Sequence, residues 1–331
     1  MSGTGVTFVI PTYNGAGRIR DPLRALLEQQ AESHHFEVVV VDNNSKDGTA
    51  RVVEASPEVA GLRQRGIEVR VVHEPRQGLL FARLRGILSA RRDVVCFLDD
   101  DNVPEPNFAT DGLAFFEDPK VGVVVSRIYP RYEVEPPPSI ARREHLLAIN
   151  HRLGDAPVDF GAQPTFAPTI GAGLWLRRAA VLEAVPWQTP EQLLPDRLGT
   201  QLLSGGDIEL GFLLGKAGHE RRYGPTLKLW HIIPGSRLQT RYFLRLIQGV
   251  VRSELTLQAR YQGKRFGGVE RLKACARLVG AGLAAPALAL RGDGAREVLF
   301  ALARRWAQVK GPYAHLAPVH GQRFSANPPE P

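Results

Sequence analysis

The chain has 331 residues, 44% of them hydrophobic, which is enough for one large domain with an appendage or for two small domains and excludes a disordered chain. Its two cysteines, Cys96 and Cys275, lie far apart, so a disulfide framework is excluded and a reducing compartment is favoured. The net charge of +8 is uneven, because residues 1–217 hold 23 Lys and Arg against 28 Asp and Glu, whereas residues 218–310 hold 18 against 5.

Four short runs rich in valine and isoleucine predict buried strands at residues 6–10, 37–41, 67–72 and 93–98. Helix-like stretches lie between them, around residues 19–27 and 79–90. This alternation builds a parallel sheet through right-handed crossovers. Ligands of such sheets gather beyond the carboxyl ends of the strands. The residues at these ends are polar: PTYN at 11–14, DNNSKDGT at 42–49 and DDDN at 99–102.

The middle of the chain carries weaker signals of the same kind. Residues 121–127 predict another strand, and the prolines at 136–138 mark a loop or boundary. A glycine-rich turn and strand follow at 171–176, and residues 207–217 predict a short amphipathic helix that ends at Gly218.

The last third is basic and helix-prone from about residue 236 to residue 310. Its charge favours an anionic membrane surface or a lipid diphosphate, and the few aromatic residues among the cations argue against nucleic acid. The longest near-apolar run, 278–290, is shorter than the roughly 20 residues of a membrane-spanning helix, and the start of the chain shows no secretion signal. We therefore expect a cytoplasmic protein that can also bind peripherally to the cytosolic face of a membrane.

Three consecutive carboxylates, Asp99, Asp100 and Asp101, end the fourth strand. They would repel one another unless a cation or hydrogen-bond donors compensate them. Hard oxygen ligands suit Mg²⁺ or Mn²⁺, which share their remaining positions with water and phosphates. The alternative is an acidic turn without a ligand.

The sequence resembles family 2 glycosyltransferases of the GT-A fold at seven ordered points between about residues 6 and 250. These are FVIPTYN (8–14), VVDNNSKDGT (40–49), GLLFARLRG (78–86), FLDDDN (97–102), GAGLWLRR (171–178), SGGDIEL (204–210) and WHIIP (230–234). The resemblance implies an enzyme that uses a nucleoside-diphosphate sugar, with a mild preference for uridine or thymidine as the nucleoside.

The resemblance also implies a set of donor-binding residues. They would hold the base, the ribose and the diphosphate, and they are Pro11, Tyr13, Asn14, Asp42, Asn44, Arg83, Asp99 and Asp100. Tyr13 would offer a stacking face for the base. The alternatives are a packing aromatic at Tyr13 and a solvated helix face at Arg83.

By the same resemblance Asp101 would be the direct ligand of Mn²⁺ or Mg²⁺, Asp99 would assist it, and His231 would complete the site. A histidine beside Trp230 is also compatible with a purely structural role.

Asp207 stands where the resemblance places the carboxylate that deprotonates the acceptor hydroxyl. Related sequences often carry an acidic pair here, and this chain has Gly206 in place of the first member, which leaves Glu209 as the reserve. The spacing of Ser204 and Asp207 also fits a helix cap.

Acceptor-binding residues and a flap complete the expected site. Gly171 and Gly173 would let a sugar approach the backbone, and Trp175 would stack on it, although a core position suits Trp175 equally. The residues expected to close over the diphosphate are Arg237, Tyr242 and Arg245, for which a solvated basic helix face is the alternative.

Together these features predict a GT-A fold with a Rossmann-like, mostly parallel sheet. We expect a nucleotide-sugar half (1–103), an acceptor half (104–235), a basic helical extension (236–315) and a disordered tail (316–331). The predicted activity is inverting, metal-assisted transfer to a glycan or lipid-linked acceptor. The alternatives are a sugar nucleotidyltransferase, which normally needs a glycine-rich phosphate loop that PTYN lacks, and a catalytically impaired sugar-nucleotide-binding protein.

Overall fold

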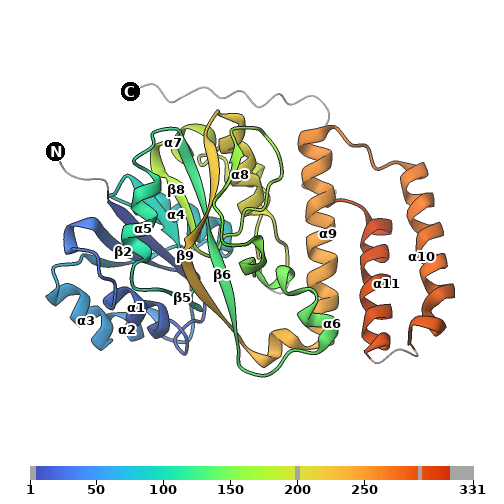
Figure 1. The fold of residues 1–331 in the computed structure, drawn as a ribbon, viewed down its shortest axis with the longest axis horizontal. Helices are drawn as coiled ribbons and strands as arrows, with labels where there is room; N and C mark the ends of the chain where they lie inside the picture. Colours follow the sequence, from blue (N-terminus) through green and yellow to red (C-terminus); the bar gives the residue numbers. More distant parts are fainter. Residues whose placement is uncertain (1–4, 198–201, 290–292, 314–331) are drawn as a thin grey trace. The chain divides into compact units, whose positions relative to one another are not determined.

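The computed structural model describes residues 5–197, 202–289 and 293–313, so the tail expected at 316–331 lies outside the described residues (Figure 1). The chain forms two compact units that alternate along the sequence. Unit 1 comprises Met1–Arg131, Ala148–Leu193 and Gly206–Ile232, and unit 2 comprises Tyr132–Leu147, Leu194–Gly205 and Ile233–Pro331. The units therefore differ from the expected division at residues 103 and 235, because two internal segments pack with the C-terminal helices.

Unit 1 is built on a sheet whose strand order is β3-β2-β1-β4-β8-β6-β9-β5, with β7 beside β9. The strands are β1 (Val6–Thr12), β2 (Phe36–Asp42), β3 (Val69–His73), β4 (Val94–Phe97), β5 (Asn102–Pro104), β6 (Val121–Tyr132), β7 (Val158–Gly161), β8 (Leu174–Arg177) and β9 (Glu220–Ile233). The first four positions of the sheet are parallel, and β8 joins β4 antiparallel. The predicted parallel sheet and its strands are confirmed.

Buried residues fill both faces of the central strands. All seven residues of β1 and all seven of β2 are buried, as their unbroken apolar runs predict for a sheet covered on two sides. One face packs valines and leucines against α4, α7 and α8, and the other gathers aromatic rings around Phe8. The helices of unit 1 are α1 (Arg20–Leu27), α2 (Thr49–Glu54), α3 (Pro57–Gln64), α4 (Leu79–Ser89), α5 (Phe108–Phe115), α7 (Arg178–Ala184) and α8 (Gly206–Lys216).

One buried carboxylate links the three neighbouring strands β1, β2 and β3. Glu37 on β2 accepts hydrogen bonds from Thr7 Oγ1 (2.7 Å), from the backbone N–H of Arg91 (2.7 Å) and from Arg70 Nη2 (2.9 Å). Burial by itself would raise the pKa of Glu37, but these donors outweigh it and hold the pKa below its ordinary value.

Unit 2 is helical. Its helices are α6 (Pro138–Ala141), α9 (Thr240–Gln262), α10 (Gly268–Ala289) and α11 (Gly294–Lys310), and α11 lies between α9 and α10 (Figure 1). The internal segment 132–147 is fastened to α11, because Arg143 binds Glu297 through two nitrogens (3.0 and 2.5 Å) and lies over the ring of Phe300. The prediction of basic helices after residue 236 is confirmed. Among the described residues, no helix has both the length and the apolar character needed to span a lipid bilayer.

Candidate active site

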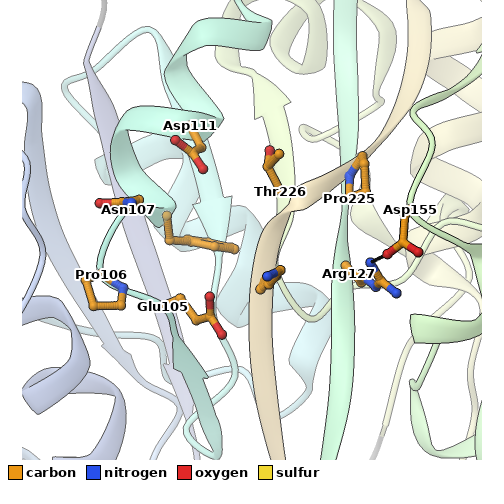
Figure 2. Close-up of a pocket in the computed structure, with 10 residues that line it drawn as sticks. Glu105, Pro106, Asn107, Asp111, Arg127, Asp155, Pro225 and Thr226 are labelled. Carbon is orange, nitrogen blue, oxygen red and sulfur yellow. Dashed lines mark hydrogen bonds and ion pairs between the residues drawn. The ribbon is translucent and has the colours of Figure 1, made fainter.

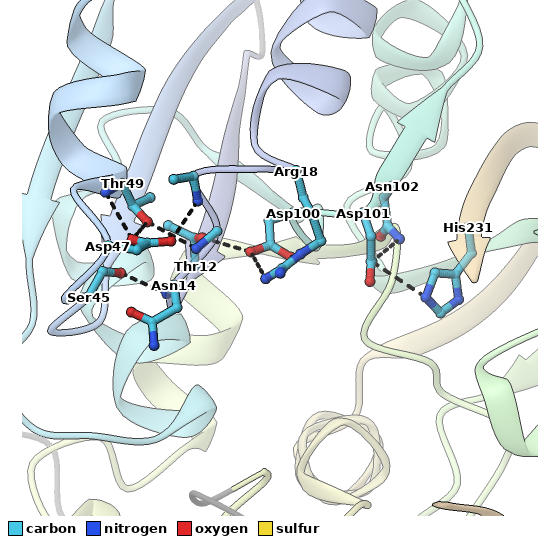
Figure 3. Close-up of polar contacts among 12 residues, drawn as sticks. Thr12, Asn14, Arg18, Ser45, Asp47, Thr49, Asp100, Asp101, Asn102 and His231 are labelled. Carbon is cyan, nitrogen blue, oxygen red and sulfur yellow. Dashed lines mark hydrogen bonds and ion pairs between the residues drawn. The ribbon is translucent and has the colours of Figure 1, made fainter. Parts of the chain in front are cut away.

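Two loops at the carboxyl ends of β1 and β2 are fastened to each other (Figure 3). The backbone N–H of Asn14 donates to Ser45 Oγ (3.0 Å), and Asn14 Oδ1 accepts from the backbone N–H of Lys46 (2.8 Å). Asp47 accepts from the backbone N–H of Ala16 (3.0 Å). Asn14 has a φ of 49°, a left-handed conformation that asparagine tolerates better than most residues. Asn14 therefore shapes the loop with its side chain, besides any contact with a ligand.

Tyr13 projects from this pair of loops. It is 46% exposed, whereas Pro11 before it is buried within β1 opposite Val41. An exposed ring at the carboxyl edge of the sheet is free to stack on a base. Pro11 is a buried strand residue, and its predicted contact with the nucleotide stays a prediction.

The loop after β2 is held by two adjacent polar residues with different tasks. Asp42 accepts from the backbone N–H of Ser45 (3.1 Å). Asn43 is buried; its Nδ2 donates to the carbonyl of Glu74 (3.0 Å), and its Oδ1 accepts from the backbone N–H of Gly78 (2.8 Å). Asn43 thus fixes the turn that begins α4 and sets the position of Arg83. Asn44 is the predicted site residue of this loop, whereas Asn43 makes the contacts that fix it; the sequence DNN directly after a strand is the signal that points to Asn43.

Asp100 is compensated by donors from the first loop. Thr12 Oγ1 donates to Asp100 Oδ2 (2.7 Å), and Arg18 donates to both carboxylate oxygens (3.2 and 2.9 Å), as Figure 3 shows. The pKa of Asp100 lies above its ordinary value, mainly because of burial and also because of the charge of Asp101. The hydrogen bonds from Arg18 and Thr12 oppose this rise. Arg18 lies in the loop that follows β1 and is absent from the predicted site residues, because its partner is 82 residues away in the sequence.

Asp101 and His231 form the candidate metal site. Both are buried, and His231 Nε2 lies 3.4 Å from Asp101 Oδ1. Strand pairing brings them together, since Asn102 at the start of β5 pairs with His231 on β9. Asn102 Nδ2 donates to Asp101 Oδ1 (3.2 Å), and Asn102 Oδ1 accepts from the backbone N–H of Asp99 (3.0 Å). The carboxylate oxygen suits Mn²⁺ or Mg²⁺, and the imidazole nitrogen is a borderline ligand for such an ion. Within the described part of the chain, no group of three or more His, Cys, Asp or Glu side chains is arranged to hold a metal ion, so a cation here would take its remaining ligands from water and a bound diphosphate.

A chain of contacts connects Asp99 to Asp207. Arg83 Nη2 lies 3.6 Å from Asp99 Oδ1, and the guanidinium sits over the ring of Phe97 (5.2 Å). The same guanidinium fills the space beside Gly171. A Cβ added to Gly171 would lie 2.7 Å from Arg83 Cζ and closer still to Nη2. The backbone N–H of Gly171 donates to Asp207 Oδ2 (2.8 Å). The structure therefore brings the predicted donor side and the predicted base together through Arg83 and Gly171.

The two carboxylates of α8 differ in their exposure to solvent. Asp207 is partly exposed in the first turn, and its Oδ1 also accepts from the N–H of Ile208 (2.8 Å), whereas Glu209 is buried. Ser204, the expected partner of a helix cap, bonds through its backbone N–H to Ser253 Oγ (3.3 Å) within unit 2. Access favours Asp207 over Glu209 as the base.

The prediction that Trp175 stacks on an acceptor is wrong. Trp175 has no exposed surface and packs between Phe8 (5.7 Å) and Phe108 (5.2 Å), because its strand is buried on both faces. Gly173 is also structural, since its φ is +63° and its carbonyl accepts from Ser126 Oγ (2.6 Å). Of the three predicted acceptor residues, only Gly171 touches the candidate site.

The predicted flap residues belong to unit 2. Arg237 lies in the short helix Gly235–Leu238, and Tyr242 and Arg245 lie in the first turns of α9. Their role over a diphosphate stays a prediction.

A row of partly exposed rings and cations lies on one face of β6 and β9. The ring of Tyr129 stacks on His151 (5.4 Å) and contacts Trp230 (5.1 Å), and Arg131 lies over Trp230 (5.5 Å). The sequence alone gives Trp230 no role beyond that of a neighbour of His231. A pocket of about 380 Å³ lies beside this row, next to Arg127 of β6 and Lys228 of β9 (Figure 2). It is lined by Glu105, Pro106, Asn107, Phe108, Asp111, Arg127, Asp155, Pro225, Thr226 and Lys228.

Comparisons with known proteins show the family to which this chain belongs. Residues 7–182 match the model of the family described as Glycosyl transferase family 2. Glycosyltransferase AglE of Haloferax volcanii is 27% identical over 189 residues, which are 53% of this chain and 60% of AglE. The amylovoran biosynthesis glycosyltransferase AmsB of Erwinia amylovora is 35% identical over 103 residues, 31% of this chain and 32% of AmsB. The match thus spans less than two thirds of these relatives.

Solved structures share the fold at low sequence identity. The mannosyltransferase PcManGT of Pyrobaculum calidifontis, in complex with GDP-Man and Mn²⁺, has a TM-score of 0.59 and 20% identity, covering 92% of this chain and 88% of its own. Residues 1–349 of S. aureus TarS, in complex with UDP-GlcNAc, have a TM-score of 0.51 and 14% identity, covering 94% and 93%.

Proposed function

Because the chain belongs to glycosyl transferase family 2, we propose that it moves a sugar from a nucleoside-diphosphate sugar to a hydroxyl of a glycan or lipid-linked acceptor, with inversion at the anomeric carbon. The family and the GT-A fold establish a transferase. The observation that carries the finer proposal is the contact chain from Asp99 through Arg83 and Gly171 to Asp207. It holds a carboxylate at a set position relative to the acidic end of β4.

Asp207 is the proposed general base. An acceptor alcohol is a poor nucleophile at neutral pH, so a positioned carboxylate must take its proton as it attacks. In the proposed step the acceptor oxygen bonds to the anomeric carbon, the bond from that carbon to the diphosphate oxygen breaks, and the acceptor proton passes to Asp207. The N–H of Gly171 holds one oxygen of Asp207 in place, which orients the carboxylate toward the acceptor.

A divalent cation would be held by Asp101 and His231, with Asp99 as a further candidate. When bound, Mn²⁺ or Mg²⁺ would neutralise the charge that develops on the leaving diphosphate. The chain's own contribution is the arrangement of the ligands, because Asn102 orients the Asp101 carboxylate by a hydrogen bond. The complex of PcManGT with Mn²⁺ supports this choice of metals.

The nucleoside is proposed to lie at the carboxyl ends of β1 and β2. Tyr13 offers its exposed ring, and Asp42 offers a carboxylate oxygen to the base. We favour uridine or thymidine. Solved relatives hold UDP-GlcNAc in one case and GDP-Man in another, so the fold accepts both pyrimidine and purine donors.

The acceptor saccharide is proposed to extend over the face of β6 and β9, in place of the role first given to Trp175. Rings such as Tyr129 and Trp230 present apolar surface to sugar rings, and nearby charged groups can bond to hydroxyls. Trp230 directly precedes His231 on β9, so the two side chains point to opposite faces of the sheet, and the proposed acceptor surface lies behind the strand that carries the metal-site histidine. Tyr129→Ala should raise the KM for acceptor and leave donor hydrolysis unchanged.

We place the enzyme in the cytosol, with its basic C-terminal third against an anionic membrane. The support is the excess of 18 Lys and Arg over 5 Asp and Glu in residues 218–310 and the two free cysteines, Cys96 and Cys275.

A screen of nucleotide sugars with Mn²⁺, and with chelator, tests the proposal. We expect one donor to raise the melting temperature and to be hydrolysed slowly in a metal-dependent manner. Asp207→Asn should keep donor binding and lose transfer by about 10²-fold or more, as expected for a general base. Glu209→Gln is the matched control on the same helix, and it should keep transfer together with an unchanged melting temperature. Donor binding without hydrolysis or transfer would instead identify a sugar-nucleotide-binding protein, and full transfer by Asp207→Asn would remove Asp207 as the base.

A further inference from the structure

Helix α10 presents large apolar side chains to solvent. Leu272 and Leu283 are 72% and 80% exposed, and Val269 and Val279 are 61% and 62% exposed. The four positions follow one another at intervals of three, seven and four residues, so they form one stripe along the helix. A surface helix normally turns its polar side to water. The outer side of α10 therefore has the character of a buried face.

The opposite side of α10 packs within unit 2. The helix lies against α11, and its buried Ala274 and half-buried Leu278 are on the side away from the stripe. The stripe and the apolar run expected at 278–290 overlap only in part, because Val279 and Leu283 belong to both, whereas Leu278 turns inward and the stripe begins earlier, at Val269. Leu290 lies outside the described residues.

Cations border the stripe. Arg271 lies on one flank of the helix, and Lys273 and Arg277 lie on the other, and all three are exposed. Lys264 and Arg265 precede the helix, so this stretch holds five cations against the single carboxylate of Glu270. We propose that the outer side of α10 docks on the surface of an anionic phospholipid bilayer, with the stripe at the boundary of headgroups and acyl chains and the cations on lipid phosphates.

Charge separates this occupant from a second copy of the chain. In a symmetric pair of α10 helices the same patch meets itself, so the flanking arginines and lysines of two copies would be placed near one another. Like charges brought together across an interface are unfavourable, whereas an anionic surface neutralises them. This inference deepens the membrane contact in the proposed function by naming the surface, and it does not depend on the chemistry at Asp207.

Cys275 allows a direct test in the natural chain. It is exposed on α10, whereas Cys96 is fully buried and burial raises the pKa of its thiol, so a maleimide dye should attach to Cys275 alone. With an environment-sensitive dye we expect a blue shift on adding vesicles of phosphatidylcholine and phosphatidylglycerol. The shift should be absent with pure phosphatidylcholine and should reverse at high salt.

Variants of the unlabelled protein test the stripe itself. Leu272→Asp with Leu283→Asp should weaken binding to the anionic vesicles about tenfold or more and leave the melting temperature unchanged, because both side chains are exposed in the folded chain. Leu88→Asp, an exposed leucine on α4 of unit 1, is the matched control and should bind vesicles normally.

Three results would overturn the inference: unchanged vesicle binding by the double variant, equal binding to neutral vesicles, or a lipid-free blue shift accompanied by a doubled mass in solution, which would assign the stripe to a second copy. Donor hydrolysis measured without vesicles keeps the two proposals apart. Loss of hydrolysis with intact vesicle binding would defeat the enzyme proposal alone, and the reverse pattern would defeat the membrane surface alone.

Discussion

Replacing Gly171 by alanine should damage the site through Arg83. The backbone at Gly171 is not left-handed, so an alanine is not strained by conformation. Its Cβ would lie 2.7 Å from Arg83 Cζ and 2.8 Å from Nη1, where ordinary contacts begin at 3.4 Å. Arg83 is 6% exposed and has little room to retreat, so the ion pair with Asp99 and the position over Phe97 must give way.

The expected loss is about 2 kcal/mol of transition-state stabilisation, or roughly 30-fold in kcat/KM. This lies below the usual cost of breaking a buried pair, because Asp99 is 30% exposed and water screens it. Transfer and donor hydrolysis should both be measured. Gly280→Ala in α10, where a Cβ meets nothing within 4 Å, is the matched control and should be fully active.

A double-mutant cycle gives the sharpest check on this reasoning. Arg83→Ala alone should lower kcat/KM, and adding Gly171→Ala to it should then cost little, because the group that clashes is gone. If the two losses simply add, or if Gly171→Ala alone is fully active, the contact between Gly171 and Arg83 is not what links the donor side to Asp207.

Further predictions concern the core, the pH response and the metal. Trp175→Phe should keep activity, whereas Trp175→Ala should lose about 3–5 kcal/mol of unfolding free energy by urea denaturation; selective loss of acceptor binding in a stable variant would contradict the core role. Because the folded pKa of Glu37 is depressed, its stabilisation is present at neutral pH and lost as the pH falls. Glu37→Gln should therefore be less stable by about 2 kcal/mol at pH 7, with a deficit that shrinks below its ordinary pKa of 4.5, and a constant deficit would exclude linkage. Asp101→Asn and His231→Ala should each weaken Mn²⁺ binding, measured by calorimetry, about 10-fold or more; unchanged affinity would move the metal elsewhere.

Much of unit 1 could be predicted from local patterns. The strands β1, β2 and β4 are unbroken apolar runs, and the polar residues that follow them had to meet at one edge once the strands were parallel. The resemblance to family 2 glycosyltransferases, and not the strand pattern, implied a metal site of Asp101 with His231 and a base at Asp207. In the structure Asp101 and His231 come close through the antiparallel pairing of β5 with β9.

The roles of individual residues could not be predicted where the sequence pattern does not show which way a side chain points. On β8 both faces are buried, so alternation does not tell which way Trp175 points, and packing against Phe8 and Phe108 decided it. The roles of Arg18 and Asn43 depend on loops that meet only after folding, at separations of 82 residues for Arg18 and Asp100 and 35 for Asn43 and Gly78. No local signal identifies such partners.

The orientation of α10 shows the same limit in another form. An amphipathic pattern predicts one apolar and one polar side, and the usual inference is that the apolar side packs. Here the buried Ala274 and the half-buried Leu278 lie on the packed side, and Leu272 and Leu283 remain exposed. The amphipathic pattern alone does not tell which apolar residues pack against α11.

The alternation of the two units along the chain limits how this enzyme can be shortened. Segments 132–147 and 194–205 contribute buried Ile140, Leu147, Leu194 and Leu203 to a unit whose other members come after residue 233. A catalytic fragment cut at residue 235 would leave these side chains without cover and would be prone to aggregation during expression. The C-terminal helices are therefore a scaffold for the middle of the chain, and swapping them between homologues would require exchanging three separate pieces of sequence.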